Sequence, residues 1–148
     1  MNAILSTSVK DTKALGGAVA RALVGRLGPV IVFLAGDLGA GKTTFVQGAG
    51  AELGVVGDMA SPTFVIQKEY AICAGAFSRL VHIDAYRIED ARERKTFDWD
   101  STAKDKQAIV FVEWPGNMGV ADPRAIVVEF EHISPDERRI KIPDDISI

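Results

Sequence analysis

The stretch "GDLGAGKTTF", Gly36–Phe45, decides how the chain folds. Residues 36–43 of this stretch match the pattern G-x-x-x-x-G-K-[ST] at every fixed position. Gly39 and Gly41 let backbone N–H groups turn inward toward a phosphate, and the ammonium of Lys42 can reach the terminal phosphates. The Thr43 hydroxyl can ligate Mg²⁺. The pattern predicts a loop that cradles the phosphates of a nucleotide.

The segments on either side of this loop agree with that prediction. The apolar run "VIVFLA" (residues 30–35) precedes it and is typical of a strand buried on both faces of a parallel sheet. Residues 42–53 predict a helix, whose first N–H groups would face a bound anion. The residues expected to bind the nucleotide here are Asp37, Leu38, Gly39, Ala40, Gly41, Lys42, Thr43 and Thr44.

The first part of the chain predicts a strand and a helix. Residues 3–7 predict a short strand, and residues 6–28 predict a helix with a capping box formed by Ser8 and Asp11. Apolar residues recur at helical spacing along it, and Gly28 with the following proline ends it. These apolar residues are Leu15, Ala18, Val19, Ala22, Leu23 and Leu27.

The second half of the chain predicts further strands. Segments 64–73 and 79–87 are strand candidates that can form a hairpin, and residues 88–107 predict a short helix or a loop. Residues 108–114 predict another buried strand, and segments 125–133 and 137–142 alternate as outer antiparallel strands do. The sum predicts an α/β fold of the P-loop NTPase-like class, with a largely parallel central sheet, antiparallel additions and flanking helices. We expect one domain over residues 1–148.

Composition limits the classes of function. The chain has 148 residues, of which 47% are hydrophobic, and its net charge is −3, which argues against a dedicated nucleic-acid binder. Cys73 is the single cysteine and is expected to be a small buried side chain. No apolar run is long enough to span a membrane. We expect a soluble, cytoplasmic protein without a membrane partner.

Two acids follow apolar strands and are candidates for the chemistry. "LVHID" ends in Asp84 and "IVFVE" ends in Glu113, so both carboxylates belong to the carboxyl ends of strands, where ligands bind in open α/β sheets. Either acid could hold Mg²⁺ or orient water, and the residues alone leave the choice open. Thr63 in "SPTF" is the candidate for sensing the γ-phosphate. His82 is expected to be a core histidine with satisfied hydrogen bonds.

Two further expectations concern the nucleotide and the basic residues near the end of the chain. A guanine-specific GTPase normally carries an N-K-x-D motif, and its absence from the sequence favours ATP. Arg138, Arg139 and Lys141 alternate with isoleucines, which predicts a solvated strand face.

Four motifs occur in a fixed order, "GDLGAGKTTF", "SPTF", "HIDAYR" and "VEWP". Together they resemble the TsaE family (formerly YjeE), small bacterial ATPases of tRNA threonylcarbamoyladenosine synthesis. The resemblance runs from about Ser8 to Pro115. It implies that Glu113 is the Walker B acid that holds Mg²⁺ together with Thr43. It also implies that Asp84 and Trp114 belong to the active site and that Lys42, Asp84 and Glu113 carry the catalysis.

The resemblance also implies partners. Members of that family act with TsaD and TsaB, and their ATP hydrolysis supports modification of the adenosine beside the anticodon, so tRNA is reached through the partner complex. Segment 88–107 departs from the family pattern by carrying several basic residues, which bears on partner contact rather than on the ATP site. The alternatives are a small-molecule kinase, which would need an acceptor pocket and a lid, and a nucleotide-binding module without hydrolysis.

Overall fold

The structure is a computed structural model that describes residues 1–59, 67–88 and 98–148. None of the helices in these ranges is long and apolar enough to cross a membrane. In chain order the elements are β1 (Asn2–Ser6), α1 (Val9–Leu23), β2 (Val30–Gly36), α2 (Lys42–Glu52), β3 (Gln67–Ala74), β4 (Phe77–Asp84), α4 (Trp99–Lys104), β5 (Ala108–Glu113), the 3₁₀-helix η1 (Pro115–Met118), β6 (Ile126–Ser134) and β7 (Glu137–Ile142).

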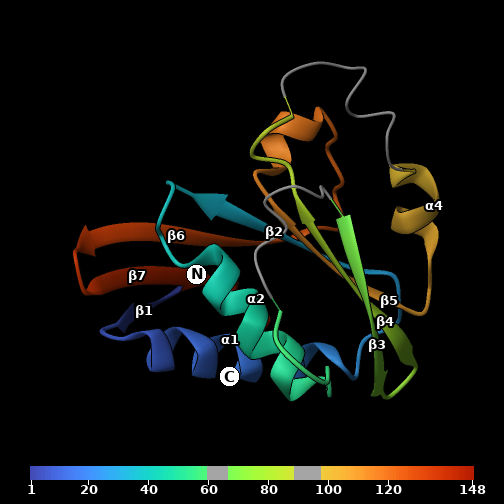
Figure 1. The fold of residues 1–148 in the computed structure, drawn as a ribbon, viewed down its shortest axis with the longest axis horizontal. Coiled ribbons are helices and arrows are strands. Elements are labelled where there is room, and N and C mark those ends of the chain that lie inside the picture. Colours follow the sequence, from blue (N-terminus) through green and yellow to red (C-terminus); the bar gives the residue numbers. More distant parts are fainter. Residues whose placement is uncertain (60–66, 89–97) are drawn as a thin grey trace.

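A seven-stranded sheet runs through the molecule in the order β1-β7-β6-β2-β5-β4-β3 (Figure 1). The middle strands β6, β2, β5 and β4 are parallel to one another, whereas β1, β7 and β3 pair antiparallel at the two sides. This confirms the α/β fold with a largely parallel centre. The expectation that β6 is an outer antiparallel strand was wrong, because β6 pairs parallel with β2 on one side and antiparallel with β7 on the other.

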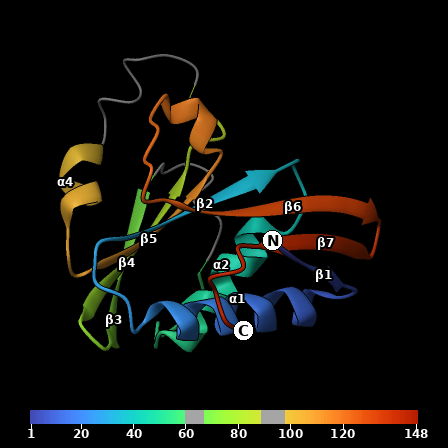
Figure 2. The ribbon, with the colours of Figure 1, turned by 180° about the vertical axis from the view of Figure 1, so that it is seen from behind.

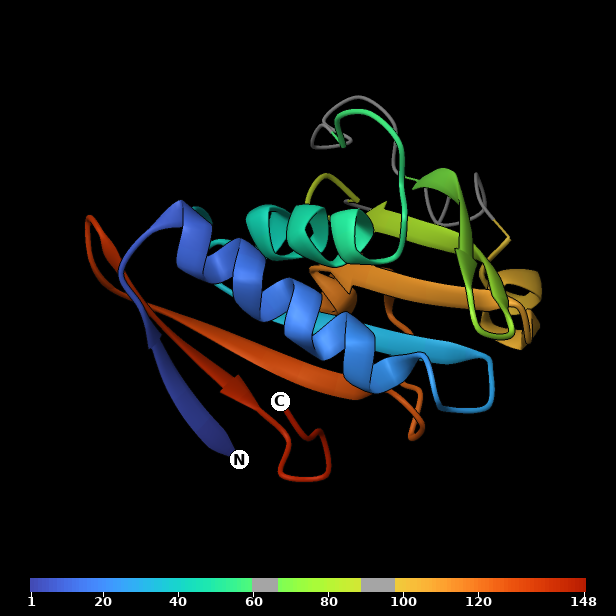
Figure 3. The ribbon, with the colours of Figure 1, turned by 90° about the horizontal axis from the view of Figure 1, so that it is seen from below.

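Strand β2 is buried on both faces, as its apolar run predicts. Val32 and Leu34 pack into a core beneath α1 and α2, and Ile31 and Phe33 pack into a second core on the opposite face, where α4 and η1 lie. Figure 3 shows α1 and α2 side by side over one face of the sheet. Strand β5 divides its side chains between the two cores in the same way.

Helix α1 begins where predicted and ends earlier than predicted. The Ser8 hydroxyl accepts a hydrogen bond from the Asp11 backbone N–H at 3.0 Å, and the Asp11 carboxylate accepts from the backbone and hydroxyl of Thr7. The capping by Ser8 is therefore confirmed, with Thr7 in place of Ser8 as the reciprocal donor. The helix ends at Leu23 rather than at residue 28, and Leu27 is 93% exposed. Six residues, 24–29, connect the helix to β2, so Leu27 lies outside the helix and does not pack against the core.

Helices α1 and α2 approach each other through glycines. A Cβ on Gly16 would lie 2.0 Å from the Phe45 carbonyl oxygen, and a Cβ on Gly48 would lie 2.0 Å from the Lys13 carbonyl oxygen. Both distances are far inside van der Waals contact. Backbone of one helix therefore touches backbone of the other, and a larger side chain at either glycine would force the helices apart.

The hairpin and the short helix predicted for the middle of the chain are present in its described part. Strands β3 and β4 pair antiparallel, and α4 lies within the segment 88–107. Residues 64–66 of the predicted strand fall outside the described residues. Cys73 is exposed, so the expectation of a buried thiol was wrong. It lies on β3, which is a strand at the edge of the sheet, beside a break in the β3–β4 register.

The two ends of the chain meet at the surface. The amino group of Met1 forms a 2.8 Å ion pair with Asp144, and Figure 2 shows the two termini close together. The final residues also pack onto the face of the sheet that α1 and α2 cover, since Ile146 belongs to the core beneath these helices. Both termini thus stay away from the carboxyl ends of the parallel strands.

The contact between α1 and α2 predicts a pair of contrasting substitutions. Gly48→Ala should lower the free energy of unfolding by about 1–3 kcal/mol, because overpacking outweighs the gain in helix propensity. Gly25→Ala is the matched control, since a Cβ there meets nothing within 4 Å, and it should change stability by less than about 0.5 kcal/mol. Urea unfolding of both variants measures this. Equal stabilities would contradict the close helix contact.

Candidate functional site

The loop after β2 has the backbone that its glycines predict. Gly39 and Gly41 have φ values of 76° and 99°, in the left-handed region that favours glycine. Gly41 is also the N-cap of α2, and no side chain of the described residues caps that helix end. The first N–H groups of α2 are thus left for another partner, and a helix N-terminus of this kind suits an anion.

Lys42 is a buried cation at the start of α2. Its side chain is 4% exposed, and its ammonium donates hydrogen bonds to the backbone carbonyls of Gly36 and Asp37, the latter at 2.9 Å. The ammonium also lies 4.1 Å from the centre of the Trp114 ring, a cation–π contact. No salt bridge among the described residues includes Lys42. Burial lowers its pKa, and the charges of Glu113, Asp84 and Asp37 act in the other direction. An anion at this place would stabilise the buried ammonium further.

Glu113 is a buried carboxylate contacted from two other elements. Its side chain is 4% exposed at the end of β5. The Thr43 hydroxyl lies 3.0 Å from Oε1 and 2.9 Å from Oε2, and Nε2 of His82 lies 2.6 Å from Oε2. The two candidate Mg²⁺ ligands, Thr43 and Glu113, are therefore in direct contact. Hydrogen bonds of this kind are what a buried carboxylate requires.

Asp84 lies beside Glu113 at the end of the neighbouring strand. The two residues are register partners in the parallel pair of β4 and β5. Asp84 is half-buried, and its Oδ1 accepts a 3.0 Å hydrogen bond from the Tyr86 backbone N–H. Burial raises its pKa and the charge of Glu113 adds to this, whereas the Tyr86 hydrogen bond and the charge of Lys42 act in the other direction.

Trp114 closes the site from the side of η1. Its φ of 58° and ψ of 51° are left-handed, which is an outlier for a bulky residue and stores about 1–3 kcal/mol of strain. The Trp114 ring lies 5.1 Å from that of Tyr86, centre to centre, and also contacts the ammonium of Lys42. Asn117 in η1 donates to the carbonyl of Ala85 at 3.1 Å, which fixes η1 against the end of β4.

The structure brings most of the predicted site residues to one end of the sheet. Lys42, Thr43, Asp84, Glu113 and Trp114 converge there through the contacts described above. Asp37, Leu38 and Gly39 are exposed on the loop, Ala40 is buried, and Thr44 is half-buried in the first turn of α2. Thr63 lies outside the described residues. The roles predicted for all of these residues stay predictions.

Sequence reasoning missed two residues of this site. His82 was expected to be a satisfied core histidine, but it contacts Glu113 and its buried Nδ1 has no hydrogen-bond partner among the described residues. The signal was available, because His82 and Asp84 are two apart on one strand and so share a face.

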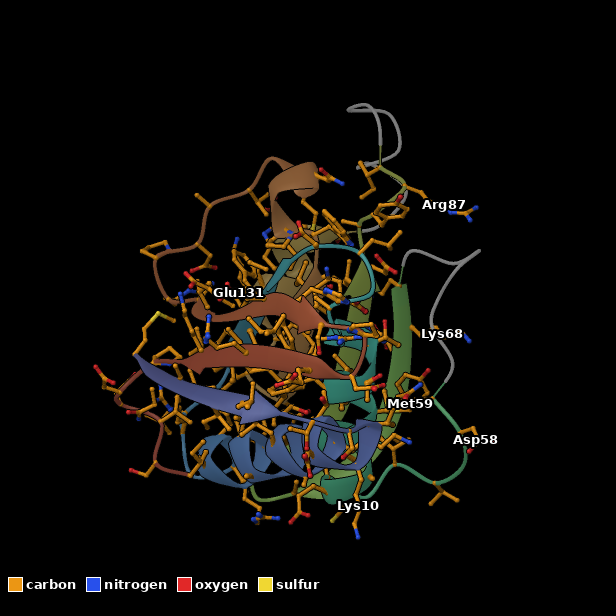
Figure 4. All side chains as sticks on the ribbon, turned by 90° about the vertical axis from the view of Figure 1, so that its left-hand side faces the viewer. Lys10, Asp58, Met59, Lys68, Arg87 and Glu131 are labelled. Atoms are coloured by element: carbon orange, nitrogen blue, oxygen red, sulfur yellow. The ribbon has the colours of Figure 1, made fainter. Side chains whose placement is uncertain are left out.

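The other missed residue is Arg138. It was expected on a solvated face, and its guanidinium instead donates to the carbonyl of Gly39 at 3.2 Å. Arg139 and Lys141 do form that exposed face, where they pair with Glu131 and Glu129. The alternation of a strand separates Arg138 from these two neighbours, because Arg138 shares its face with the buried Ile140 and Ile142. Arg87, for which no role was assigned, points outward from the molecule (Figure 4).

Comparison with known proteins assigns the family. Residues 6–140 match the sequence profile of the family described as "Threonylcarbamoyl adenosine biosynthesis protein TsaE". The chain belongs to the TsaE family. The resemblance found in the four motifs is thereby confirmed, and with it a place among proteins of tRNA threonylcarbamoyladenosine biosynthesis.

Individual TsaE relatives support the assignment at the level of sequence and fold. A curated relative from Streptomyces coelicolor, named tRNA threonylcarbamoyladenosine biosynthesis protein TsaE, is 44% identical over 85 residues, which are 57% of this chain and 55% of the relative. The protein of the same name from Mycobacterium bovis is 34% identical over 141 residues, covering 89% of this chain and 80% of the relative. The crystal structure of YdiB from Bacillus subtilis aligns with a TM-score of 0.69 and 27% identity, covering 94% of this chain and 82% of that one.

The raised pKa of Asp84 predicts a pH-dependent gain in stability when its charge is removed. Below the ordinary value of 3.8, the carboxyl is protonated in both states. As the pH rises from there, the unfolded chain ionises first, so the wild-type protein loses stability until the folded carboxyl also ionises. Asp84→Asn cannot ionise and keeps an acceptor for Tyr86. It should be more stable than the wild type at pH 7, and the difference should shrink toward pH 4.

Urea unfolding of both proteins between pH 4 and pH 8 measures this difference. A difference that is the same at every pH, or a less stable Asp84→Asn protein at pH 7, would contradict the assigned cause.

Proposed function

We propose that this TsaE-family protein binds and hydrolyses ATP with Mg²⁺ at the end of the sheet where β2, β4 and β5 finish. The observation that carries the proposal is the buried ammonium of Lys42. It lies against an open helix N-terminus and lacks a carboxylate partner among the described residues, beside the paired Thr43 and Glu113. A terminal phosphate would supply the anion that this arrangement lacks. The missing N-K-x-D motif favours adenine over guanine as the base.

The polar groups present fit a magnesium ion shared with phosphate oxygens. Among the described residues, no group of three or more His, Cys, Asp or Glu side chains could hold a metal by itself. Mg²⁺ is usually bound by one or two carboxylates together with substrate phosphates and water. Thr43 and Glu113 would hold the ion, and bound Mg²⁺·ATP would supply the phosphoryl group for hydrolysis.

The residues of the chain then have separable tasks. Lys42 can turn from the carbonyls of Gly36 and Asp37 to a terminal phosphate, because its ammonium rotates on a flexible stem. Asp84 is half-buried with a raised pKa, which brings the carboxyl nearer to the range in which it can take a proton from water. Trp114 covers the ammonium and limits access of water from that side.

We further propose that the protein acts in the cytoplasm with TsaD and TsaB in tRNA threonylcarbamoyladenosine synthesis. The family assignment supports this role, because relatives carry that biosynthesis in their names. The net charge of −3 supports an indirect route to tRNA through the partner complex. Hydrolysis in such a system supports repeated cycles of the modifying complex.

Removing the charge of Lys42 tests the nucleotide site. Lys42→Met keeps an apolar stem against Trp114 and should weaken ATP binding about tenfold or more, since hydrogen bonds to charged groups contribute about 1.5–3 kcal/mol. Lys10→Ala is the matched control, because Lys10 is exposed on α1 and points outward (Figure 4). Titration with a fluorescent ATP analogue in Mg²⁺ measures both. Equal affinities in the two variants would reject the phosphate cradle.

The role in a complex has its own test. We expect slow ATP turnover by the isolated protein and a clear rise when TsaD and TsaB from the same organism are added, because no arginine finger is evident in the segment "GDMASPTF", residues 57–64. Threonylcarbamoylation of tRNA should then continue over several turnovers only when this protein is present. Equal multi-turnover product with and without it would refute this role while leaving the ATP chemistry untouched.

A further inference from the structure

We infer that His82 is a positioning residue for Glu113, which fixes the carboxylate so that it and Thr43 can hold the magnesium ion. The inference rests on the proposed Mg²⁺·nucleotide site and adds a residue to it. Its basis is one buried contact: Nε2 of His82 lies 2.6 Å from Oε2 of Glu113, and the two side chains are 2% and 4% exposed.

The surroundings of the imidazole determine which nitrogen carries the proton. A carboxylate only accepts hydrogen bonds, so Nε2 of His82 donates to Glu113. Nδ1 is buried without a partner in the described part of the chain. At this buried nitrogen, an unpaired acceptor costs less free energy than an unpaired N–H donor would. The geometry therefore places a proton on Nε2, where the imidazole donates to Glu113.

The backbone holds both partners of this contact rigidly. Glu113 ends β5, which lies between β2 and β4 in the middle of the sheet. His82 lies on β4, where it pairs with Phe111 of β5 on one side and with Lys68 of β3 on the other. The side chains of His82 and Glu113 lie on the sheet face that carries α2, so Thr43 meets the same carboxylate. Strand pairing therefore fixes the backbone positions from which both side chains extend.

The hydrogen bonds to the two carboxylate oxygens differ, and this difference defines the task of His82. Oε2 is held by His82 and also touched by Thr43, whereas Oε1 is touched by Thr43 alone. The one proton of the Thr43 hydroxyl is shared between the two oxygens, and the lone pairs of the hydroxyl stay available to a cation. Because His82 occupies Oε2, Oε1 would be the oxygen left to help hold the ion together with Thr43. Partners of a metal ligand act in this way, and their loss typically lowers metal affinity about 10–100-fold.

A purely structural role for His82 makes a different prediction. If the imidazole only fills space beneath the site, its replacement changes the stability of the fold and leaves the dependence on Mg²⁺ as it was. A positioning role requires that the Mg²⁺ dependence changes and that a side chain with a similar N–H donor restores it. The two roles can therefore be separated by comparing His82→Phe, which has the volume without the donor, with His82→Gln, which has a donor.

The experiment measures nucleotide binding as a function of Mg²⁺ concentration, with a fluorescent ADP analogue, in the full chain. His82→Phe should raise the Mg²⁺ concentration needed for half-maximal binding about tenfold or more, and binding in EDTA should stay within about twofold of the wild type. His82→Gln should recover most of the loss. His132→Phe is the matched control, because His132 is the other of the two histidines and is exposed on β6. It should behave as the wild type.

Each outcome either supports the inference or overturns it. An unchanged Mg²⁺ dependence in His82→Phe overturns it, and so does a His82→Gln protein no better than His82→Phe. If the wild type binds no nucleotide, the proposed function fails instead. ¹⁵N NMR of the wild type gives a readout that needs no folded variant, since the chain has only two histidines. A buried imidazole with a proton on Nδ1 alone, and therefore no donor at Nε2, would overturn the inference.

Discussion

The carboxylate of Glu113 is the group around which the end of the sheet is organised. It is almost completely buried, and a buried charge is tolerated only when other groups hydrogen-bond to it. Those groups come from two other elements, the hydroxyl of Thr43 on α2 and the imidazole of His82 on β4. Satisfying this one carboxylate therefore fixes how the first turn of α2 sits over the strands. The loop that leads into α2 takes its position from the same requirement.

Helices α1 and α2 also help to position the glycine-rich loop that contains Gly41. Gly16 and Gly48 let the backbones of α1 and α2 touch, so α2 cannot slide along α1. The start of α1 is held in turn, because Thr12 shares a buried 2.7 Å hydrogen bond with Ser6 at the end of β1. A Cβ on Gly41 would lie 3.5 Å from the Thr12 methyl, so the loop rests on α1. Small residues far from the acids thus also help to position the glycine-rich loop.

The site itself holds several features that oppose folding. Lys42 is a buried cation with a lowered pKa, Asp84 is an acid with a raised pKa, and Trp114 has a left-handed backbone. Such features persist at functional sites because the rest of the structure compensates for them. Here the compensation comes from the two cores on either face of the sheet, which enclose the alternating apolar side chains of β2 and β5. A bound polyphosphate would relieve the first of these three features directly.

Features that depend on short stretches of chain could be read from the sequence. The glycine-rich loop, the doubly buried strands and the acids Asp84 and Glu113 at strand ends all follow from local spacing, because side-chain direction repeats regularly along a strand or helix. Features that join distant stretches could not. The parallel pairing of β6 with β2, the reach of Arg138 to Gly39 across 99 positions and the bond between His82 and Glu113 across 31 positions are examples. Strand order and packing in three dimensions choose these partners, and no local pattern encodes the choice.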